Sequence, residues 1–191
     1  MLFDGIKVTD TEGLYWRNST YNTRSFIPDT EEIYDLFPMY FILDMGRKAS
    51  YSRLKVYNRN RQPVYSGWIW IEFDLWGANE VKPFTEVGNG SQQDNLKYWT
   101  SWEFLGGTDQ WKEGWEKLAT CIVTFPSGTP NTVTQATIPE DIAFVQAGFE
   151  YEIDPDMVDK PFRYLRFEMK RNNIQGQLHW AELEFFGAYA E

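Results

Sequence analysis

The sequence predicts an all-β protein, an antiparallel β-sandwich or jelly roll with long loops and little helix. Three observations predict it. Short runs that alternate apolar and polar side chains recur along the 191 residues, with Gly, Pro and Asn between them. Helical periodicity is thin. Aromatic residues make up 18% of the chain, and each ring can bury roughly 150–250 Å². Strands that follow strands at short spacing favour a sandwich over an alternating α/β chain.

The first predicted strands are 40–44, which is apolar and ends before a glycine, and 51–57, which alternates with the two-residue period of a half-buried strand. The alternation is sharpest over 68–76, where we expect Phe73 on one face and Trp70 on the other. The later strands are predicted from the same kind of run at 118–125, 144–153, 161–170 and 178–186.

Helical signals are confined to 29–37 and 109–118. Two longer stretches without periodicity, 78–100 and 126–143, are rich in Gly, Pro, Asn, Thr and Gln. We expect both to be surface loops, which is where binding residues concentrate. The whole chain, 1–191, is interpreted as one domain. Its start fits a cytoplasmic protein as well as a module excised from a larger exported protein.

Charge and composition exclude several functions. The formal net charge is −10, which argues against nucleic acid as a partner because its binding needs clustered Lys and Arg. No apolar window is long enough to span a membrane, and no signal peptide opens the chain. One Cys and one His exclude an intramolecular disulfide and a Cys/His zinc site. Cys121 is expected to be a buried, inert thiol.

A basic stretch without acids runs from 47 to 62. Its Arg53 and Lys55 fit a solvated strand face, whereas Arg59 and Arg61 are expected in a loop with Tyr57. Guanidinium forks and asparagine amides suit the hydroxyl pattern of a sugar or a carboxylate. Both interpretations of this stretch remain open.

Nine tryptophans are more than one core face is expected to absorb. An exposed indole offers its apolar face to the C–H side of a pyranose. The best-placed pairs near loop signals are Trp16 with Arg17, and Trp99 with Trp102. A place in the core is the alternative for each ring.

Carboxylate pairs are weak evidence of hydrolysis in a chain with 28 acids. Glu72 and Asp74 share a strand face, as a hydrolase cleft requires, but a solvated sheet face explains them as well. The lone His179 fits a structural role in a strand. The known nucleophile, zinc and phosphate-loop motifs are missing from the sequence, so an enzyme is not expected.

Several runs in order resemble a discoidin-type (coagulation factor type C) domain. They are Tyr40–Gly46, Ser52–Val56, Phe73–Gly77, Phe162–Phe167 and Ala181–Gly187. The chain is most similar to C-terminal discoidin-like domains of Bacteroidetes surface proteins encoded beside polysaccharide-utilisation genes.

The resemblance implies a galactose-binding-like β-sandwich that binds glycans through end loops, at the cell surface, outside the cell or in the periplasm. It also implies a structural Ca²⁺ held by Asp4, Thr9, the Ala181 carbonyl and Glu182. The family often has Asn or Asp two residues after the first ligand, where this chain has Ile6.

The leading hypothesis is therefore a non-catalytic carbohydrate-binding module. Its predicted ligand residues are Trp16, Arg17, Tyr57, Arg59, Arg61, Trp99, Trp102, Asn172 and Asn173. A structural or protein-interaction module of a cell-surface polysaccharide-utilisation assembly, with other domains of the same protein as partners, is the second hypothesis. A jelly-roll hydrolase that uses Glu72 and Asp74 is the third.

Overall fold

The computed structural model describes eight stretches: 16–17, 40–59, 63–66, 69–82, 92–99, 101, 106–172 and 179–190. The strands in these stretches are β1 (Trp16–Arg17), β2 (Tyr40–Asn58), β3 (Trp70–Ala78), β4 (Glu116–Ile122), β5 (Phe149–Glu152), β6 (Phe162–Asn172) and β7 (His179–Tyr189). The helices are α1 (Gln92–Trp99), α2 (Pro139–Ala147) and the short 3-10 helix η6 (Gln110–Lys112). Every strand pair is antiparallel, so the predicted all-β class is confirmed.

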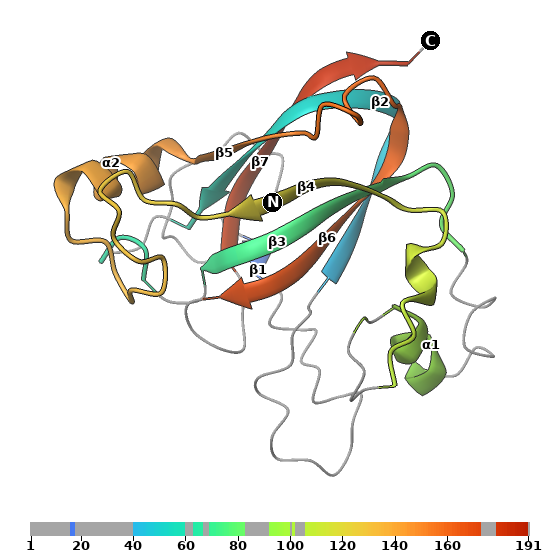
Figure 1. Ribbon diagram of the computed structural model, residues 1–191, viewed down its shortest axis with the longest axis horizontal. Helices are drawn as coiled ribbons and strands as arrows, with labels where there is room; N and C mark the ends of the chain where they lie inside the picture. Colours follow the sequence, from blue (N-terminus) through green and yellow to red (C-terminus); the bar gives the residue numbers. More distant parts are fainter. Residues whose placement is uncertain are drawn as a thin grey trace.

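The strands form a sandwich whose two layers share β2. The first half of β2 pairs with β6, and the order then continues through β3 to β4. The second half of β2 lies between β7 and β5, and β1 pairs with the outer side of β7. We call these the β6 layer and the β7 layer. Figure 1 shows β2 bending at the upper corner of the molecule, with α1 and α2 at opposite ends.

The bend in β2 has a local cause. Pairing shifts register between Asp44 and Ala49, and Gly46 in between has a φ of 78°, in the left-handed region that favours glycine. The backbone N–H of Gly46 donates to Asp44 Oδ1 at 2.8 Å, which closes an Asx-type turn. The chain thereby crosses from one layer to the other without a break in the strand.

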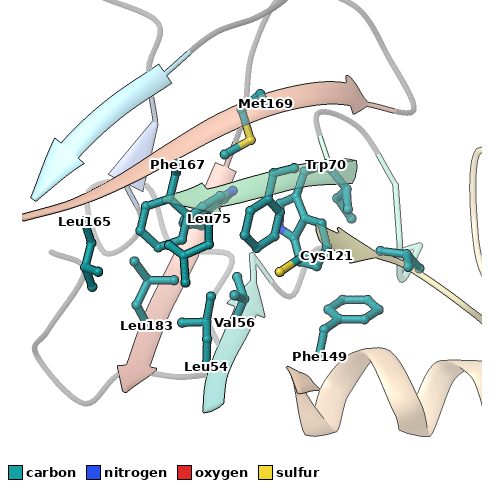
Figure 2. Close-up of a cluster of buried hydrophobic side chains, with 14 of the residues drawn as sticks. Leu54, Val56, Trp70, Leu75, Cys121, Phe149, Leu165, Phe167, Met169 and Leu183 are labelled. Carbon is teal, nitrogen blue, oxygen red and sulfur yellow. The ribbon is translucent and has the colours of Figure 1, made fainter. Parts of the chain in front are cut away.

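The core lies between the two layers. Aromatic rings meet across it: Phe41 lies 5.0 Å from Trp180, and Trp70 lies 5.0 Å from Phe149, measured between ring centroids. Figure 2 shows Phe149 and Leu54 opposite Phe167 and Trp70. Burial of such rings supplies most of the folding free energy.

Cys121 is buried in this core, and its burial raises the pKa of the thiol well above its ordinary value. A thiol held neutral in an apolar setting is a poor nucleophile. The side chain therefore acts as a small hydrophobic group.

Several predicted elements need correction. The segment 144–153 is not one strand, because α2 occupies its first part and only β5 remains. The expected helix 109–118 is reduced to η6, and β4 begins at Glu116. The expected loops 78–100 and 126–143 contain α1 and the start of α2. The predicted helix 29–37 lies outside the described residues.

Trp70 also departs from its predicted face. Between Trp70 and Glu72, β3 advances two residues while β6 advances one, so β3 carries one extra residue there. A single bulge of this kind reverses the alternation of the side chains on its own strand. Trp70 consequently joins Phe73 in the core, with 5.0 Å between the ring centroids.

Candidate functional site

Four strands end or begin together at one end of the sandwich, opposite the β2 bend. Arg17 is paired with His179 at the start of β7, and Asn58 at the end of β2 is paired with Trp180. Across the core, Trp70 at the start of β3 is paired with Asn172 at the end of β6. The 6.4 Å contact between the rings of Trp70 and Trp180 joins the two layers here. We call this the strand-end site.

The strand-end site collects four of the predicted ligand residues by backbone position. They are Trp16, Arg17, Arg59 and Asn172. Arg59 directly follows β2 and is half-buried. For the other three the structure describes the backbone alone. Arg61, Trp102 and Asn173 lie outside the described residues, so their roles stay predictions.

Two predicted ligand residues lie elsewhere. Tyr57 is not in a loop but in β2, where it is 7% exposed and its hydroxyl donates to Glu184 Oε2 at 2.8 Å. Trp99 ends α1 and is 5% exposed, with its ring against Tyr98 at 4.9 Å. Neither buried ring presents a face to a ligand, so we leave both out of the site.

The expected surplus of rings is largely absorbed by a second aromatic cluster. It lies on the outer side of the β6 layer, beneath α1 and η6, and contains Ala78, Tyr98, Trp99, Trp111 and Trp115. Tyr40, Ile42, Trp76, Val81 and Tyr164 pack against it and are partly buried. Among the tryptophans whose side chains are described, Trp76 alone falls outside the buried class.

Arg166 is the centre of this second cluster. Its side chain is fully buried, between the ring of Trp111 at 3.6 Å and that of Tyr40 at 4.0 Å. One guanidinium N–H donates to the Trp99 carbonyl at 2.7 Å. Burial lowers the pKa of Arg166 to about 10, opposed by nearby Tyr40 and Glu168, and the ring faces offset part of the lost hydration.

A charge network adjoins Arg166 on the same sheet face. Asp74, itself buried, accepts from Thr120 Oγ1 at 2.8 Å and pairs with Lys117 at 3.1 Å. Lys170 lies 3.6 Å from Asp74 and 3.2 Å from Glu168.

The supposed hydrolase pair is held by cations. Asp74 belongs to the network described above, and Glu72 is bound by Arg171 at 2.9 Å. Each of these two carboxylates is therefore already the partner of a cation on the sheet.

Two cations of the basic stretch share one carboxylate on the sheet surface, and a third stacks on a ring. Arg53 pairs with Glu150 at 2.7 Å, and Lys55 lies 3.8 Å from the same carboxylate. Arg47 stacks 3.1 Å above the ring of Tyr189 near the β2 bend. These arginines thus belong to the sheet surface and not to the strand-end site.

The structure describes two of the four expected calcium ligands, Ala181 and Glu182. Asp4 and Thr9 lie outside the described residues. Ala181 is the extra residue of a bulge in β7, since Tyr57 faces Glu182 and Asn58 faces Trp180, and a bulge frees backbone groups from the ladder. Glu182 adds a carboxylate that is 3% exposed. An oxygen donor set of this kind fits Ca²⁺, and the site stays a prediction.

Within the described residues no group of three or more His, Cys, Asp or Glu side chains is arranged to hold a metal ion. The helices of the described ranges are also too short or too polar to cross a membrane.

Two buried groups do not follow from the sequence pattern. Asn58 is 4% exposed, and neither its amide nitrogen nor its amide oxygen has a hydrogen-bond partner among the described residues, a costly state for a buried amide. Arg166 lies in the predicted strand 161–170, whose pattern does not predict that its guanidinium is buried. In 161–170, Arg166 and Glu168 alternate with apolar residues and share a strand face with Tyr164. This pattern indicates a polar face, and the face is buried only because α1 and η6 cover it.

The fold and the strand-end site define a β-sandwich domain that gathers polar and aromatic residues at one end of its strands. The family described as a domain of unknown function, DUF5000, matches residues 16–187. The chain therefore belongs to this family. A search of the curated proteins found no match.

Solved structures show related folds. SusE-like protein BT2857 is 28% identical, with a TM-score of 0.59 over 82% of this chain and 50% of that chain. This chain thus spans half the length of that relative. The C-terminal domain of a chitobiase from Bacteroides fragilis is 13% identical, with a TM-score of 0.45 over 82% of this chain and 68% of that chain. CBM32-3 from a family 31 glycoside hydrolase of Clostridium perfringens is 12% identical, with a TM-score of 0.44 over 80% and 69%.

Proposed function

We propose that the protein is a non-catalytic carbohydrate-binding module whose ligand site is the strand-end site. The observation that carries the proposal is the backbone register, which brings Trp16, Arg17, Arg59 and Asn172 to one end of a rigid sandwich. An indole, two guanidinium groups and an amide are the groups that recognise a pyranose by stacking and by hydrogen bonds.

Two further points support glycan binding. The discoidin-like motifs imply a module that binds glycans through loops at one end. The likeness to SusE-like protein BT2857, of which this chain spans half the length, supports a place in a longer SusE-like protein. On this proposal the chain is one module of a longer exported protein, and Ca²⁺ at Asp4, Thr9, Ala181 and Glu182 stabilises the fold without taking part in recognition.

The test is affinity gel electrophoresis on immobilised polysaccharides. We expect retardation on at least one of amylopectin, galactomannan, xyloglucan and polygalacturonate. The Arg59→Ala variant is expected to weaken retention about tenfold, because hydrogen bonds from a charged donor are among the stronger ones.

The matched control is Arg53→Ala, which removes an arginine of β2 that is paired with Glu150 and lies outside the strand-end site. This variant is expected to be retained like the wild type. No retardation on any of the four gels, or equal losses in both variants, contradicts the proposal. Release of reducing ends from the same polysaccharides would contradict its non-catalytic part.

A second function, a protein-interaction module, is favoured by one observation at the opposite end. Tyr189 is 63% exposed with Arg47 stacked on it, and Tyr and Arg are enriched in binding hot spots. A partner that co-purifies with the wild type and is lost from Tyr189→Ala would support this function.

A further inference from the structure

The outer side of the β6 layer carries an indole that the strand-end site does not use. Trp76 is partly exposed on β3, and its neighbours across the sheet are Arg166 on β6 and Lys117 on β4. The second aromatic cluster lies against it, with the ring of Trp111 at 5.1 Å in an edge-on contact. Trp76 is thus a ring at the border between a buried cluster and solvent.

The ring of Trp76 is held in place by the buried ring of Trp111. Trp111 contacts both the Trp76 ring and the buried guanidinium of Arg166. A ring that is already ordered loses little conformational freedom when a ligand stacks on it, and this preorganisation favours binding.

Polar groups of the kind that bind hydroxyls lie close to the ring. The ammonium groups of Lys112 and Lys117 each lie over it, 5.9 Å from its centroid, and Lys112 is partly exposed while Lys117 is exposed. Thr120, in the next row of the sheet, is exposed and shares the Asp74 carboxylate with Lys117. An indole with donors and acceptors close to it suits a pyranose, whose C–H face is apolar and whose rim is polar.

The local charge selects the ligand class. Lys117 is paired with Asp74 at 3.1 Å, and Lys112 with Asp109 at 2.9 Å. Each cation next to the ring therefore has its own anion, and the whole chain carries −10. An acidic polysaccharide would gain no net attraction here and would be repelled by the chain as a whole.

The same face is a poor match for a protein partner. Of the exposed large apolar side chains in the described ranges, Ile122, Ile138 and Tyr189, only Ile122 is in register with this part of the sheet. A single exposed aliphatic group falls short of the contiguous apolar patch that marks such interfaces.

We infer that Trp76, with Lys112, Lys117 and Thr120, forms a second carbohydrate subsite on the outer side of the β6 layer, selective for pyranose units of neutral polysaccharides. The inference rests on the proposed glycan-binding function but concerns a different surface. Two subsites on one module bind a long polysaccharide more tightly than either alone, through the effective concentration of the second.

The test compares Trp76→Ala, Lys117→Ala and Arg59→Ala by affinity gel electrophoresis on amylopectin, galactomannan, xyloglucan and polygalacturonate. We expect Trp76→Ala to lose about tenfold in affinity on a neutral gel, Lys117→Ala to lose less, and polygalacturonate to give no retention through this face.

If Arg59→Ala loses retention while Trp76→Ala does not, the second subsite is overturned and the strand-end site stands. If only Trp76→Ala loses it, the second subsite stands and the strand-end site is overturned. Wild type without retention on any neutral gel overturns the second subsite, and wild type without retention on any of the four gels overturns both.

A second readout separates binding from folding, because Trp76 also packs on Trp111. Indole ¹⁵N–¹H signals of the wild-type chain are recorded with and without maltoheptaose, cellohexaose or mannohexaose, and the Trp76 signal is assigned by its loss in Trp76→Phe. A concentration-dependent shift of that signal supports the subsite. An unmoved Trp76 signal with each of these oligosaccharides overturns it.

Discussion

At the scale of single residues, the exposed pair of Asp44 and Arg163 gives a defined electrostatic signature. Two guanidinium N–H groups donate to the two carboxylate oxygens, each at 2.8 Å. The hydrogen bond from Arg163, with help from the Gly46 N–H, lowers the pKa of Asp44 to about 2. Because the folded-state pKa is depressed, this stabilisation is present above the ordinary value of 3.8 and is lost as pH falls from there towards 2.

We predict that Arg163→Gln returns the pKa of Asp44 towards 3.8, because the charged donor that favours the carboxylate is gone. Carboxyl ¹³C NMR titration of both proteins measures the shift. An Asp44 titration curve that is the same in the variant would show that Arg163 is not its cause.

Two glycines near the β2 bend separate steric from conformational effects. A Cβ at position 187 would overlap the backbone carbonyl oxygen of Ser50, whereas one at Gly46 would meet open space. We predict that Gly187→Ala destabilises the protein by about 3 kcal/mol, as overpacking against backbone does. Gly46→Ala should cost about 1 kcal/mol, because only its positive φ is unfavourable for alanine. Urea unfolding of both variants tests the order, and the reverse order would refute the packing of β7 on β2.

At the scale of elements, Arg166 fastens α1 and η6 to the β6 layer through Trp99 and Trp111. We predict that Arg166→Ala lowers the free energy of unfolding by about 3 kcal/mol. The substitution removes a buried hydrogen bond and leaves a cavity between the rings of Tyr40 and Trp111. Arg166→Lys should restore little, since an ammonium group lacks the planar fork that stacks between two rings.

Hydrogen exchange locates that effect. Amides of α1 should lose protection in Arg166→Ala before those of β7, because α1 is joined to the sheet through Trp99. Uniform loss of protection across both elements, or full rescue by lysine, would contradict a local fastening role for Arg166.

The strands were predictable from the sequence, but their register was not. The alternation in 161–170 and 178–186 gave β6 and β7 nearly in full. Trp70 was assigned to the wrong face because the register shifts beside Glu72 leave no mark in a pattern of period two. The helix α1 was missed because the first four of its eight residues are polar, so its sequence shows too short an apolar stripe to predict a helix.

At the scale of the whole molecule, the composition predicted the sandwich but misjudged what the rings do. The prediction assumed one core and therefore a surplus of exposed indoles. The molecule instead builds a second cluster on the outer side of the β6 layer and buries Trp99, Trp111 and Trp115 in it. The strand-end site was predictable only as residue types, Arg17, Arg59 and Asn172 among them, because their proximity follows from pairings between distant segments.

The most direct test of the central claim is an amide ¹⁵N–¹H NMR titration of the chain with neutral and acidic oligosaccharides. The account predicts saturable shifts at residues 16–17, 58–59, 172 and 179–180, at the strand-end site, with those near the β2 bend unchanged. Absence of shifts with every sugar, or shifts confined to 45–49 and 187–189, would contradict it.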